Sequence, residues 1–301
     1  MHVAVCCITF RRPDGLRSLL EGLARLGFAR VPAPRITVIV VDNDAAEPMR
    51  EVVENVRGGF PWGLVYASEA VQGVASARNR CLDLVPADAD YIASIDDDEV
   101  PVPGWLDELL AVAREHGAPI VQGPVRPAFV ASPPGWVERG RFLELGPYED
   151  GRALHFGYAG NCLIEAAVVR RLGLRFDERF NRTGGEDQHF FGTALKAGLP
   201  IVTAAGAIVD ETVPPGRATL RYLLRRRFRM GNTLAMIERI DGGRSALAAR
   251  ALKGCGRIAV GIGQCVLLAP RGLAGLATGL CNMAWGTGAL VGLLGLRYRE
   301  Y

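Results

Sequence analysis

The sequence predicts an α/β fold, a doubly wound mixed sheet, followed by a C-terminal helical segment that associates with a membrane. Three observations predict it. Short β-branched runs alternate with helical patterns in the N-terminal half, polar and acidic residues directly follow several of these runs, and residues 258–301 are apolar and rich in glycine. Alternating strands and helices are typical of a sheet covered on both faces. Such sheets bind ligands beyond the carboxyl ends of their strands.

The predicted elements follow from hydrophobic patterning. Val3–Ile8 and Ile36–Val41 are nearly continuous β-branched runs, as expected for strands buried on both faces. Between them, leucines at 16, 19, 20, 23 and 26 predict a helix over Pro13–Leu26. The later predictions are strands at Leu64–Tyr66, Tyr91–Ile95 and Ile120–Val121, and helices at Ala75–Val85, Pro103–His116 and residues 186–197. Residues 125–160 read as a long loop or a small subdomain.

Charge is distributed unevenly along the 301 residues. The net charge is +3, but residues 216–257 carry +9 and residues 258–301 carry +2, which leaves −8 for the first 215. An acidic body with a basic and then apolar tail argues against a nucleic-acid-binding protein. Seven cysteines without metal-ligand spacing predict reduced, mostly buried thiols in a cytosolic compartment. The apolar first residues favour a buried strand over a secretory signal.

The tail predicts membrane association. Residues 272–296 contain no charge, and roughly 20 apolar residues suffice to cross the hydrocarbon. Gly275/Gly279 and Gly288/Gly292 have the spacing of closely packed helices. Residues 258–270 are too short to span and suggest an interfacial or re-entrant helix; a soluble helical hairpin is the alternative. We expect a catalytic domain at 1–215, a basic helical segment at 216–257 and the apolar tail at 258–301.

Three consecutive aspartates follow the strand predicted at Tyr91–Ile95. On an extended chain Asp96 and Asp98 share one face and Asp97 points away. Two oxygen donors on one face suit Mg²⁺ or Mn²⁺, which bind through few carboxylates, water and substrate phosphates. The alternative is a solvated acidic turn. We interpret the run as a metal site.

Other polar residues follow the strands or open helices. Thr9 and Arg11, at the end of the first strand, are candidate donor-binding residues. Asp42 ends the second strand, where it could contact a nucleoside or cap the next helix. Arg78 and Asn79 could meet a diphosphate or lie on a surface helix. Glu186 and Asp187 follow two glycines. They could supply a general base, or they could only complement the helix dipole.

Together these motifs have a recognisable order: "CITFRRPDGL", "VVDND", "GVASARNR", "IDDDEVP", "GNCLI", "FDERF" and "GGEDQHF". Over roughly residues 2–235 this order resembles the family 2 glycosyltransferases, which have the GT-A fold. The resemblance is greatest to bacterial enzymes that build cell-surface polysaccharides. It implies an inverting transfer from a nucleoside-diphosphate sugar, with Mg²⁺ or Mn²⁺ on the diphosphate.

The resemblance also implies residue roles. Asp42 would contact the nucleobase, Asp96 the ribose or sugar, and Asp98 the metal. Asp187, in the pair with Glu186, would be the catalytic base. The sequence departs from the family where many relatives place a metal-binding His, because "AIVDETVPPGR" offers Asp210 or Glu211 instead, of which Glu211 is our candidate.

A second departure concerns the C-terminal part. The Gln-x-x-Arg-Trp motif of processive synthases is missing, and "YLLRRRFRMGN" stands in its place. Arg226 and Arg229 could contact the diphosphate or anionic lipid. We expect the enzyme to act on a lipid-linked or glycan acceptor at the cytoplasmic face of the inner membrane. The alternatives are a sugar-1-phosphate nucleotidyltransferase, which would need a Gly-rich, Lys-containing phosphate loop after the first strand, and a non-catalytic membrane-bound scaffold.

Overall fold

The computed structural model describes residues 1–146 and 148–298, and the chain forms two compact units. Unit 1 contains Met1–Pro127, Glu144–Asn181 and Glu186–Thr212, and unit 2 contains Ala128–Leu143, Arg182–Gly185 and Val213–Tyr301. Each unit is therefore assembled from separate stretches of the chain. The predicted long loop at 125–160 is divided between them.

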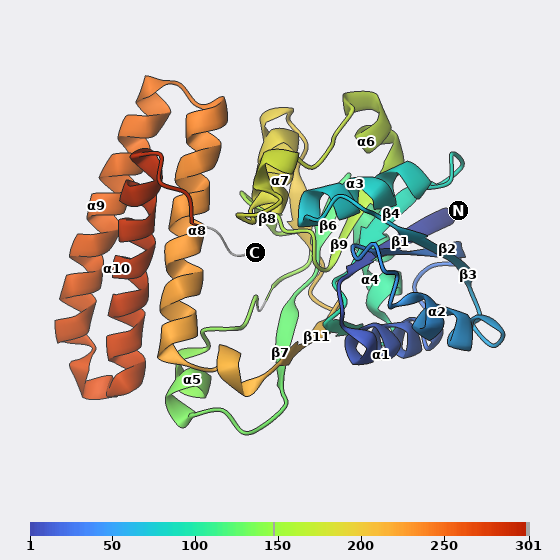
Figure 1. Ribbon diagram of the computed structural model, residues 1–301, viewed down its shortest axis with the longest axis horizontal. Helices are drawn as coiled ribbons and strands as arrows, with labels where there is room; N and C mark the ends of the chain where they lie inside the picture. The colour runs from blue at the N-terminus through green and yellow to red at the C-terminus, as the bar shows by residue number, and fades with distance from the viewer. Residues whose placement is uncertain (147, 299–301) are drawn as a thin grey trace. The chain divides into compact units, whose positions relative to one another are not determined.

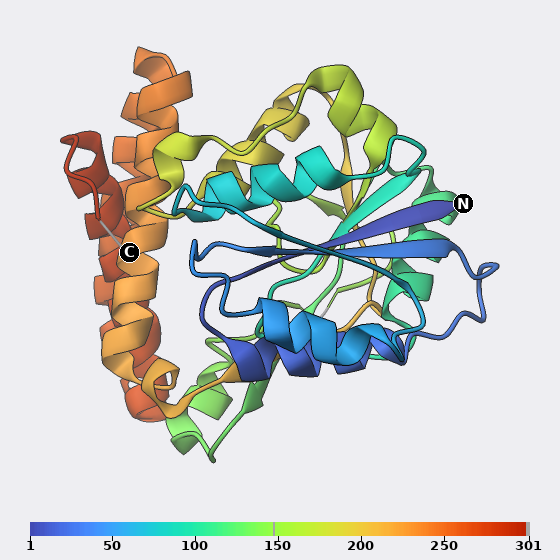
Figure 2. The ribbon, with the colours of Figure 1, turned by 45° about the vertical axis from the view of Figure 1, so that its right-hand side comes forward.

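Unit 1 is built around a mixed sheet with the strand order β3-β2-β1-β4-β9-β6-β10-β8 (Figures 1 and 2). The strands β1 (His2–Thr9), β2 (Arg35–Asp42), β3 (Gly63–Ser68) and β4 (Tyr91–Ser94) run parallel. The strand β9 (Cys162–Glu165) lies antiparallel between β4 and β6 (Ile120–Gln122), while β10 (Ile201–Thr203) pairs with β6 and with β8 (Ala153–Leu154). The prediction of a mixed, doubly wound sheet is confirmed.

The sheet separates two hydrophobic cores. In β1, Val3, Val5 and Cys7 face one core, and Ala4 and Cys6 face the other. The first core is covered by α1 (Pro13–Ala24), α2 (Arg50–Arg57) and α4 (Trp105–His116), and the second by α3 (Val74–Leu84), α6 (Ala166–Leu172) and α7 (Glu186–Lys196) (Figure 2). Burial on both faces explains why β1 and β2 are continuously apolar.

A smaller sheet has the order β5-β11-β7, formed by β5 (Glu99–Pro101), β11 (Val209–Val213) and β7 (Val125–Phe129). Its strand β5 directly follows the three aspartates, and β5 pairs antiparallel with β11. This pairing joins the acidic run to a stretch of chain more than a hundred residues later.

Unit 2 contains α5 (Gly135–Gly140) and three long helices, α8 (Leu220–Asp241), α9 (Arg244–Leu267) and α10 (Leu273–Leu293). Short 3₁₀ turns at Pro215–Arg217 and Ala269–Arg271 precede α8 and α10, and a third, Glu178–Phe180, lies in unit 1. Residues 258–267, predicted as the start of a short interfacial or re-entrant helix, are helical but form the second half of α9, which starts at Arg244 and continues unbroken through 258. The first half of α9 is basic and the second half is apolar, and no proline interrupts the helix between them.

The helix α10 lies against both α8 and α9 along its length (Figure 1). A Cβ on Gly288 would lie 2.0 Å from the Phe228 carbonyl oxygen, and one on Gly279 would lie 2.5 Å from that of Gly261. The prediction that these glycines permit close helix packing is confirmed. Among the described residues, α10 is the one helix long and apolar enough to cross a membrane, and 44% of its most apolar window is buried within the protein.

Candidate active site

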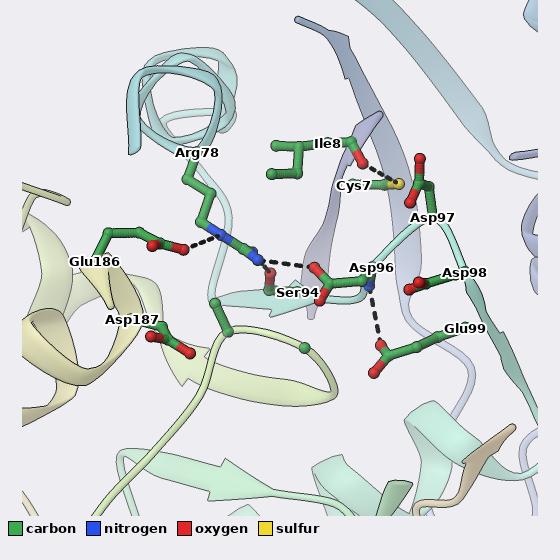
Figure 3. Close-up of polar contacts among 12 residues, drawn as sticks. Cys7, Ile8, Arg78, Ser94, Asp96, Asp97, Asp98, Glu99, Glu186 and Asp187 are labelled. Carbon is green, nitrogen blue, oxygen red and sulfur yellow. Dashed lines mark hydrogen bonds and ion pairs between the residues drawn. The ribbon is translucent and has the colours of Figure 1, made fainter. Parts of the chain in front are cut away.

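Arg78 connects two groups of carboxylates in unit 1. Its side chain is buried on α3, and its Nη2 donates a 2.8 Å hydrogen bond to Asp96 Oδ1 (Figure 3). Its Nε lies 3.4 Å from Glu186 Oε1 at the start of α7. Burial lowers the pKa of Arg78, but Asp96, Glu186 and Asp187 together raise it above its ordinary value. One permanently charged guanidinium therefore joins the acidic run to the Glu-Asp pair.

Glu186 and Asp187 have different environments although they are neighbours. Glu186 is buried, and burial, reinforced by repulsion from Asp187 and opposed by Arg78, raises its pKa to about 7. Asp187 is partly exposed at the first turn of α7, where its Oδ1 accepts a 2.7 Å hydrogen bond from the Gln188 backbone N–H. Only Asp187 of this pair has the access that a base for an external hydroxyl needs.

The three aspartates do not alternate as predicted. The strand β4 ends at Ser94, and Asp97 and Asp98 form a turn, so the extended geometry that would put Asp96 and Asp98 on one face does not apply. Asp96 binds Arg78, whereas Asp97 and Asp98 both accept hydrogen bonds from Arg12 Nη1, at 2.9 and 3.0 Å. The prediction that Asp97 points away from Asp98 is wrong, because both carboxylates bond to the same Arg12 nitrogen.

Asp97 anchors the turn to the end of β1. It is buried and accepts a 2.9 Å hydrogen bond from the Thr9 hydroxyl as well as the bond from Arg12. Burial raises the pKa of Asp97 to about 6, although Arg12 acts in the opposite direction. Thr9, predicted to contact the donor, therefore positions the acidic turn, and Arg12, in the motif "FRRP", is a site residue that patterning missed.

Oxygen ligands for a divalent cation gather beside this turn. In the ladder between β5 and β11, Glu211 lies opposite Glu99, and the Thr212 backbone N–H donates a 2.8 Å hydrogen bond to the Asp98 carbonyl oxygen. The backbone thus brings the two predicted ligands, Asp98 and Glu211, to the same region. Glu99 is buried, and burial followed by repulsion from Asp96 raises its pKa well above the ordinary value.

The donor set fits an ion that is shared with a diphosphate. Across residues 1–146 and 148–298, no group of three or more His, Cys, Asp or Glu side chains is placed to hold a metal by itself. Mg²⁺ ordinarily uses one or two carboxylates and completes its coordination with water and substrate phosphates. Asp98 and Glu211 offer hard oxygens of that kind, beside several further carboxylates whose charge favours a cation.

The backbone of Gly160 approaches the acidic cluster closely. A Cβ at this position would lie 2.8 Å from Glu99 Oε1 and 3.1 Å from Asp96 Oδ2. The next residue, Asn161, is fully buried with a positive φ of 48°. Its Oδ1 accepts a 2.7 Å bond from Trp105 Nε1, and its Nδ2 donates 2.8 Å bonds to two carbonyl oxygens, those of Pro124 and Ala207. Asn161 fixes the loop that carries Gly160.

The remaining predicted donor-binding residues have other partners. The Asp42 carboxylate is fully buried and accepts from the backbone N–H groups of Asp44 and Met49, the residue before α2, and from the Tyr66 hydroxyl. This geometry matches the alternative interpretation of Asp42 as a cap for the following helix. It leaves no exposed carboxylate oxygen there for a nucleobase.

Arg11 and Asn79 also bind within the protein. Arg11 Nε donates a 2.5 Å bond to Asp44 Oδ2 from a largely exposed side chain. Both amide atoms of Asn79 bond to the Phe176 backbone, at 2.8 and 2.9 Å, so the predicted diphosphate contact of Asn79 is replaced by a structural role. Arg226 and Arg229 lie on α8 in unit 2 and are not among the residues that unit 1 brings together.

Comparison with known proteins gives a consistent result. Residues 4–173 match the family model described as "Glycosyl transferase family 2". The succinoglycan biosynthesis protein ExoM of Rhizobium meliloti is 37% identical over 234 residues, which is 77% of this chain and 74% of that protein. A glucosyl-dolichyl phosphate glucuronosyltransferase of Haloferax volcanii is 25% identical over 63% of this chain and 59% of its own length.

Solved structures share the fold. The mannosyltransferase PcManGT from Pyrobaculum calidifontis, determined with GDP-Man and Mn²⁺, superposes with a TM-score of 0.61 and 18% identity over 95% of this chain and 86% of its own. The structure of S. aureus TarS residues 1–349 in complex with UDP-GlcNAc superposes with a TM-score of 0.54 and 16% sequence identity. The match covers 99% of this chain and 93% of that one. The GT-A-like fold predicted from the motif order is confirmed.

Proposed function

Because this chain belongs to glycosyl transferase family 2, we propose that it moves a sugar from a nucleoside-diphosphate-sugar donor to a hydroxyl of a lipid-linked or glycan acceptor, in polysaccharide synthesis. The observation that carries the proposal is the bridge made by Arg78, which holds Asp96 beside Glu186, the neighbour of Asp187. A donor-side carboxylate and an accessible base are thereby held in one charged cluster. The similarity to a succinoglycan biosynthesis protein supports the acceptor class.

The donor occupies the acidic turn in this proposal. Asp98 and Glu211 would hold Mg²⁺ or Mn²⁺, which when bound offsets the negative charge of the departing nucleoside diphosphate. Asp96, oriented by Arg78, would contact the ribose or the sugar. Gly160 leaves room for the donor at this point because its missing side chain would otherwise occupy the space next to Asp96.

The chemical step is a single displacement with Asp187 as the base. The acceptor hydroxyl oxygen forms a bond to the anomeric carbon while the bond from that carbon to the diphosphate oxygen breaks, and the configuration inverts. The hydroxyl proton moves to the Asp187 carboxylate, and the nucleoside diphosphate leaves with the electron pair. Glu186, buried against Arg78, positions this cluster without touching the acceptor.

The proposed location is the cytoplasmic face of the inner membrane. All seven cysteines are free thiols, as a reducing compartment requires. The helices of unit 2, with their basic and apolar residues, suit an enzyme whose acceptor is anchored in a bilayer.

A thermal-shift screen of nucleoside diphosphates with and without Mn²⁺ tests donor binding, because ligands of the folded state raise its apparent stability. We expect one base to be preferred and Mn²⁺ to increase its effect. No shift with any nucleoside diphosphate would contradict the proposed donor.

The base is tested by Asp187→Asn. We expect kcat for transfer to fall about 10²–10⁴-fold while the nucleotide-induced shift is retained, because general-base catalysis contributes on that order. Asp83→Asn, which changes an exposed carboxylate on α3, is the matched control and is expected to be unchanged. Full transfer activity in Asp187→Asn would overturn the assignment.

A further inference from the structure

The outward face of α9 carries an apolar stripe that nothing in unit 2 covers. Its exposed members are Leu252, Cys255, Val260, Ile262, Val266 and Leu267. At 100° per residue these six positions lie within an arc of about 160°. Leu252, Val266 and Leu267 are 75%, 71% and 78% exposed, as large as apolar exposures become in this protein. Contiguous exposure of this kind marks an interaction surface.

The opposite face of α9 already has a partner. Gly254 and Gly261 are buried against α10, where their absent side chains allow backbone contact with Gly286 and Gly279. The glycine face of α9 therefore lies in the interior of the helix bundle, and the apolar stripe remains on its outer surface. The helix α10, which among residues 1–146 and 148–298 is the one long and apolar enough to span a membrane, is the inner helix of the three.

Charge identifies the partner of the stripe. No Asp or Glu occurs from Gly242 to Tyr298, whereas five basic residues do occur between 244 and 271. Lys253 is exposed just outside one border of the stripe at helical spacing, and Arg257, further round towards α10, is also exposed although its Nη1 bonds to Asn282. Two copies of so basic a face would repel each other if they met. A surface of anionic lipid is complementary in both charge and apolarity.

The dimensions favour a helix that lies along the membrane surface. From Leu252 to Leu267 the stripe is about 22 Å long at 1.5 Å per residue, shorter than the roughly 30 Å hydrocarbon core. Lys253 and Arg257 would have to enter the hydrocarbon if α9 crossed it, whereas at the interface their long side chains can reach the headgroups.

We propose that the Leu252–Leu267 stripe of α9 docks in the interface of a membrane rich in anionic lipid, with α10 remaining inside the protein. This inference deepens the membrane location within the proposed function and does not depend on the sugar chemistry. It assigns lipid contact to α9 rather than to α10, the helix whose length and hydropathy fit a membrane span.

The test uses the full chain with vesicles of phosphatidylcholine, with and without phosphatidylglycerol. Cys255 is the exposed one of the seven cysteines, so an environment-sensitive fluorophore attached there reports directly on the stripe. We expect co-sedimentation and a blue shift with anionic vesicles, both weakened by salt. Cys255→Ser treated with the same reagent gives the background from the less accessible thiols.

Val260→Glu/Val266→Glu places two charges on the stripe at exposed positions, so folding is expected to be retained. Its affinity for anionic vesicles should fall at least about tenfold, since charged groups are disfavoured in the interface. Val130→Glu, which changes a similarly exposed valine of unit 2 away from α9, should bind as the unsubstituted chain does.

Three results would overturn the inference. The first is vesicle binding by the double variant as strong as that of the unsubstituted chain. The second is a fluorophore at Cys255 whose emission shows no blue shift when the protein is bound to vesicles. The third is a dimer of the unsubstituted chain in solution that becomes monomeric in the double variant. The nucleotide-induced thermal shift is measured on the same variants. Loss of lipid binding with an unchanged shift separates this surface from the donor site, so either proposal can fail alone.

Discussion

At the scale of single residues, Arg12 is the cation that the acidic turn already contains. Its Nη1 bonds to both Asp97 and Asp98, while its side chain remains about half exposed. An incoming divalent ion at Asp98 must share that carboxylate with the guanidinium. If the proposed function holds, Arg12 would compete with the metal for Asp98 until a diphosphate bound that both cations can contact.

Arg12→Gln should strengthen the binding of Mn²⁺ in the absence of nucleotide. Removing one positive charge a few ångströms from Asp98 raises the local negative potential, and we expect a gain of roughly three- to tenfold in affinity. Titration of free Mn²⁺ by electron paramagnetic resonance measures it. Arg17→Gln, which removes a guanidinium further along α1, is the control, and equal affinities of both variants would contradict the expectation.

Glu186 gives the folded protein a dependence on pH. Its folded-state pKa of about 7 lies above the ordinary value of 4.5, so the folded state binds the proton more tightly than the unfolded state does. This contribution to stability is complete below about pH 4.5 and is lost as the pH rises through 7. Asp97 and Glu99 shift in the same direction.

Glu186→Gln should reduce the loss of stability between about pH 5 and 7.5. The amide cannot ionise, so the part of the slope due to Glu186, on the order of 1–3 kcal/mol, disappears. Urea unfolding across this range, compared with the unsubstituted chain, measures the difference. Parallel pH profiles for the two proteins would show that Glu186 ionises normally.

At the scale of elements, the loop between β8 and β9 is held by two fully buried side chains, Gln122 and Asn161. Asn161→Ala would leave the Trp105 indole N–H and two carbonyl oxygens without this partner. Buried polar groups left unsatisfied cost about 1–3 kcal/mol each, and alanine also tolerates a positive φ poorly. We expect the free energy of unfolding to fall by about 3 kcal/mol, measured by urea denaturation.

The consequence of Asn161→Ala should extend to the donor site. The loop beside Asp96 and Glu99 would keep the bond from Gln122 to the Gly160 carbonyl oxygen but lose those of the Asn161 side chain. We therefore expect the nucleotide-induced thermal shift to shrink by more than the loss of overall stability accounts for. Asn43 supplies a useful contrast as another loop amide, whose side chain holds the backbone of residues 69, 71 and 73. Equal effects of Asn43→Ala and Asn161→Ala on nucleotide binding would argue against a specific role for the Gly160 loop.

Sequence patterning predicted the elements whose burial is local and continuous. β1 and β2 are apolar on both faces, and α1 shows its leucine stripe, so each was recognisable by itself. β9 was not recognisable, because its four residues show no alternation of apolar and polar side chains. Its place in the sheet depends on antiparallel pairing with β4 and β6. α2 was missed because its eight residues present only Val52 and Val53 to the core.

The candidate site was predictable in composition and less so in geometry. The motif order located Asp96, Asp98 and Asp187. The turn at Asp97 places Asp98 with Asp97 on Arg12, however, and not with Asp96 as the extended chain predicted. The bridge from Asp96 through Arg78 to Glu186 joins residues 18 and 108 positions apart, and no periodicity reports such a contact. Three site residues were not predicted individually, namely Arg12, Glu99 and Gly160. Each lies within a motif that the sequence analysis had quoted, and this proximity to predicted site residues was the one sequence signal that could have found them.

At the scale of the whole molecule, unit 2 depends on segments far apart in sequence. Val137 and Leu143 share a hydrophobic cluster with Val213, Leu223 and Cys281. A chain ending at Thr212 would retain the 128–143 segment without the helices that cover it. We expect this truncation to bind the dye ANS and to aggregate, as chains with exposed apolar surface do.

The comparison is made by size-exclusion chromatography and ANS fluorescence of the truncated and full chains. Val137→Ser/Leu143→Ser in the truncated chain is the matched variant, since it removes the apolar side chains that would be uncovered. Improved solubility of that variant is expected. A monodisperse truncated chain without ANS binding would show that the segment does not need unit 2.

The dispersed make-up of unit 2 also has a consequence for biosynthesis. Cys281 leaves the ribosome 138 residues after Leu143, with which it shares a cluster. At roughly 5–20 residues per second the earlier segment waits for about 7 to 28 seconds before its partner exists. During that interval Val137 and Leu143 are substrates for chaperones. The order of synthesis thus leaves this short stretch waiting for its partners longer than the apolar C-terminus, which is made last.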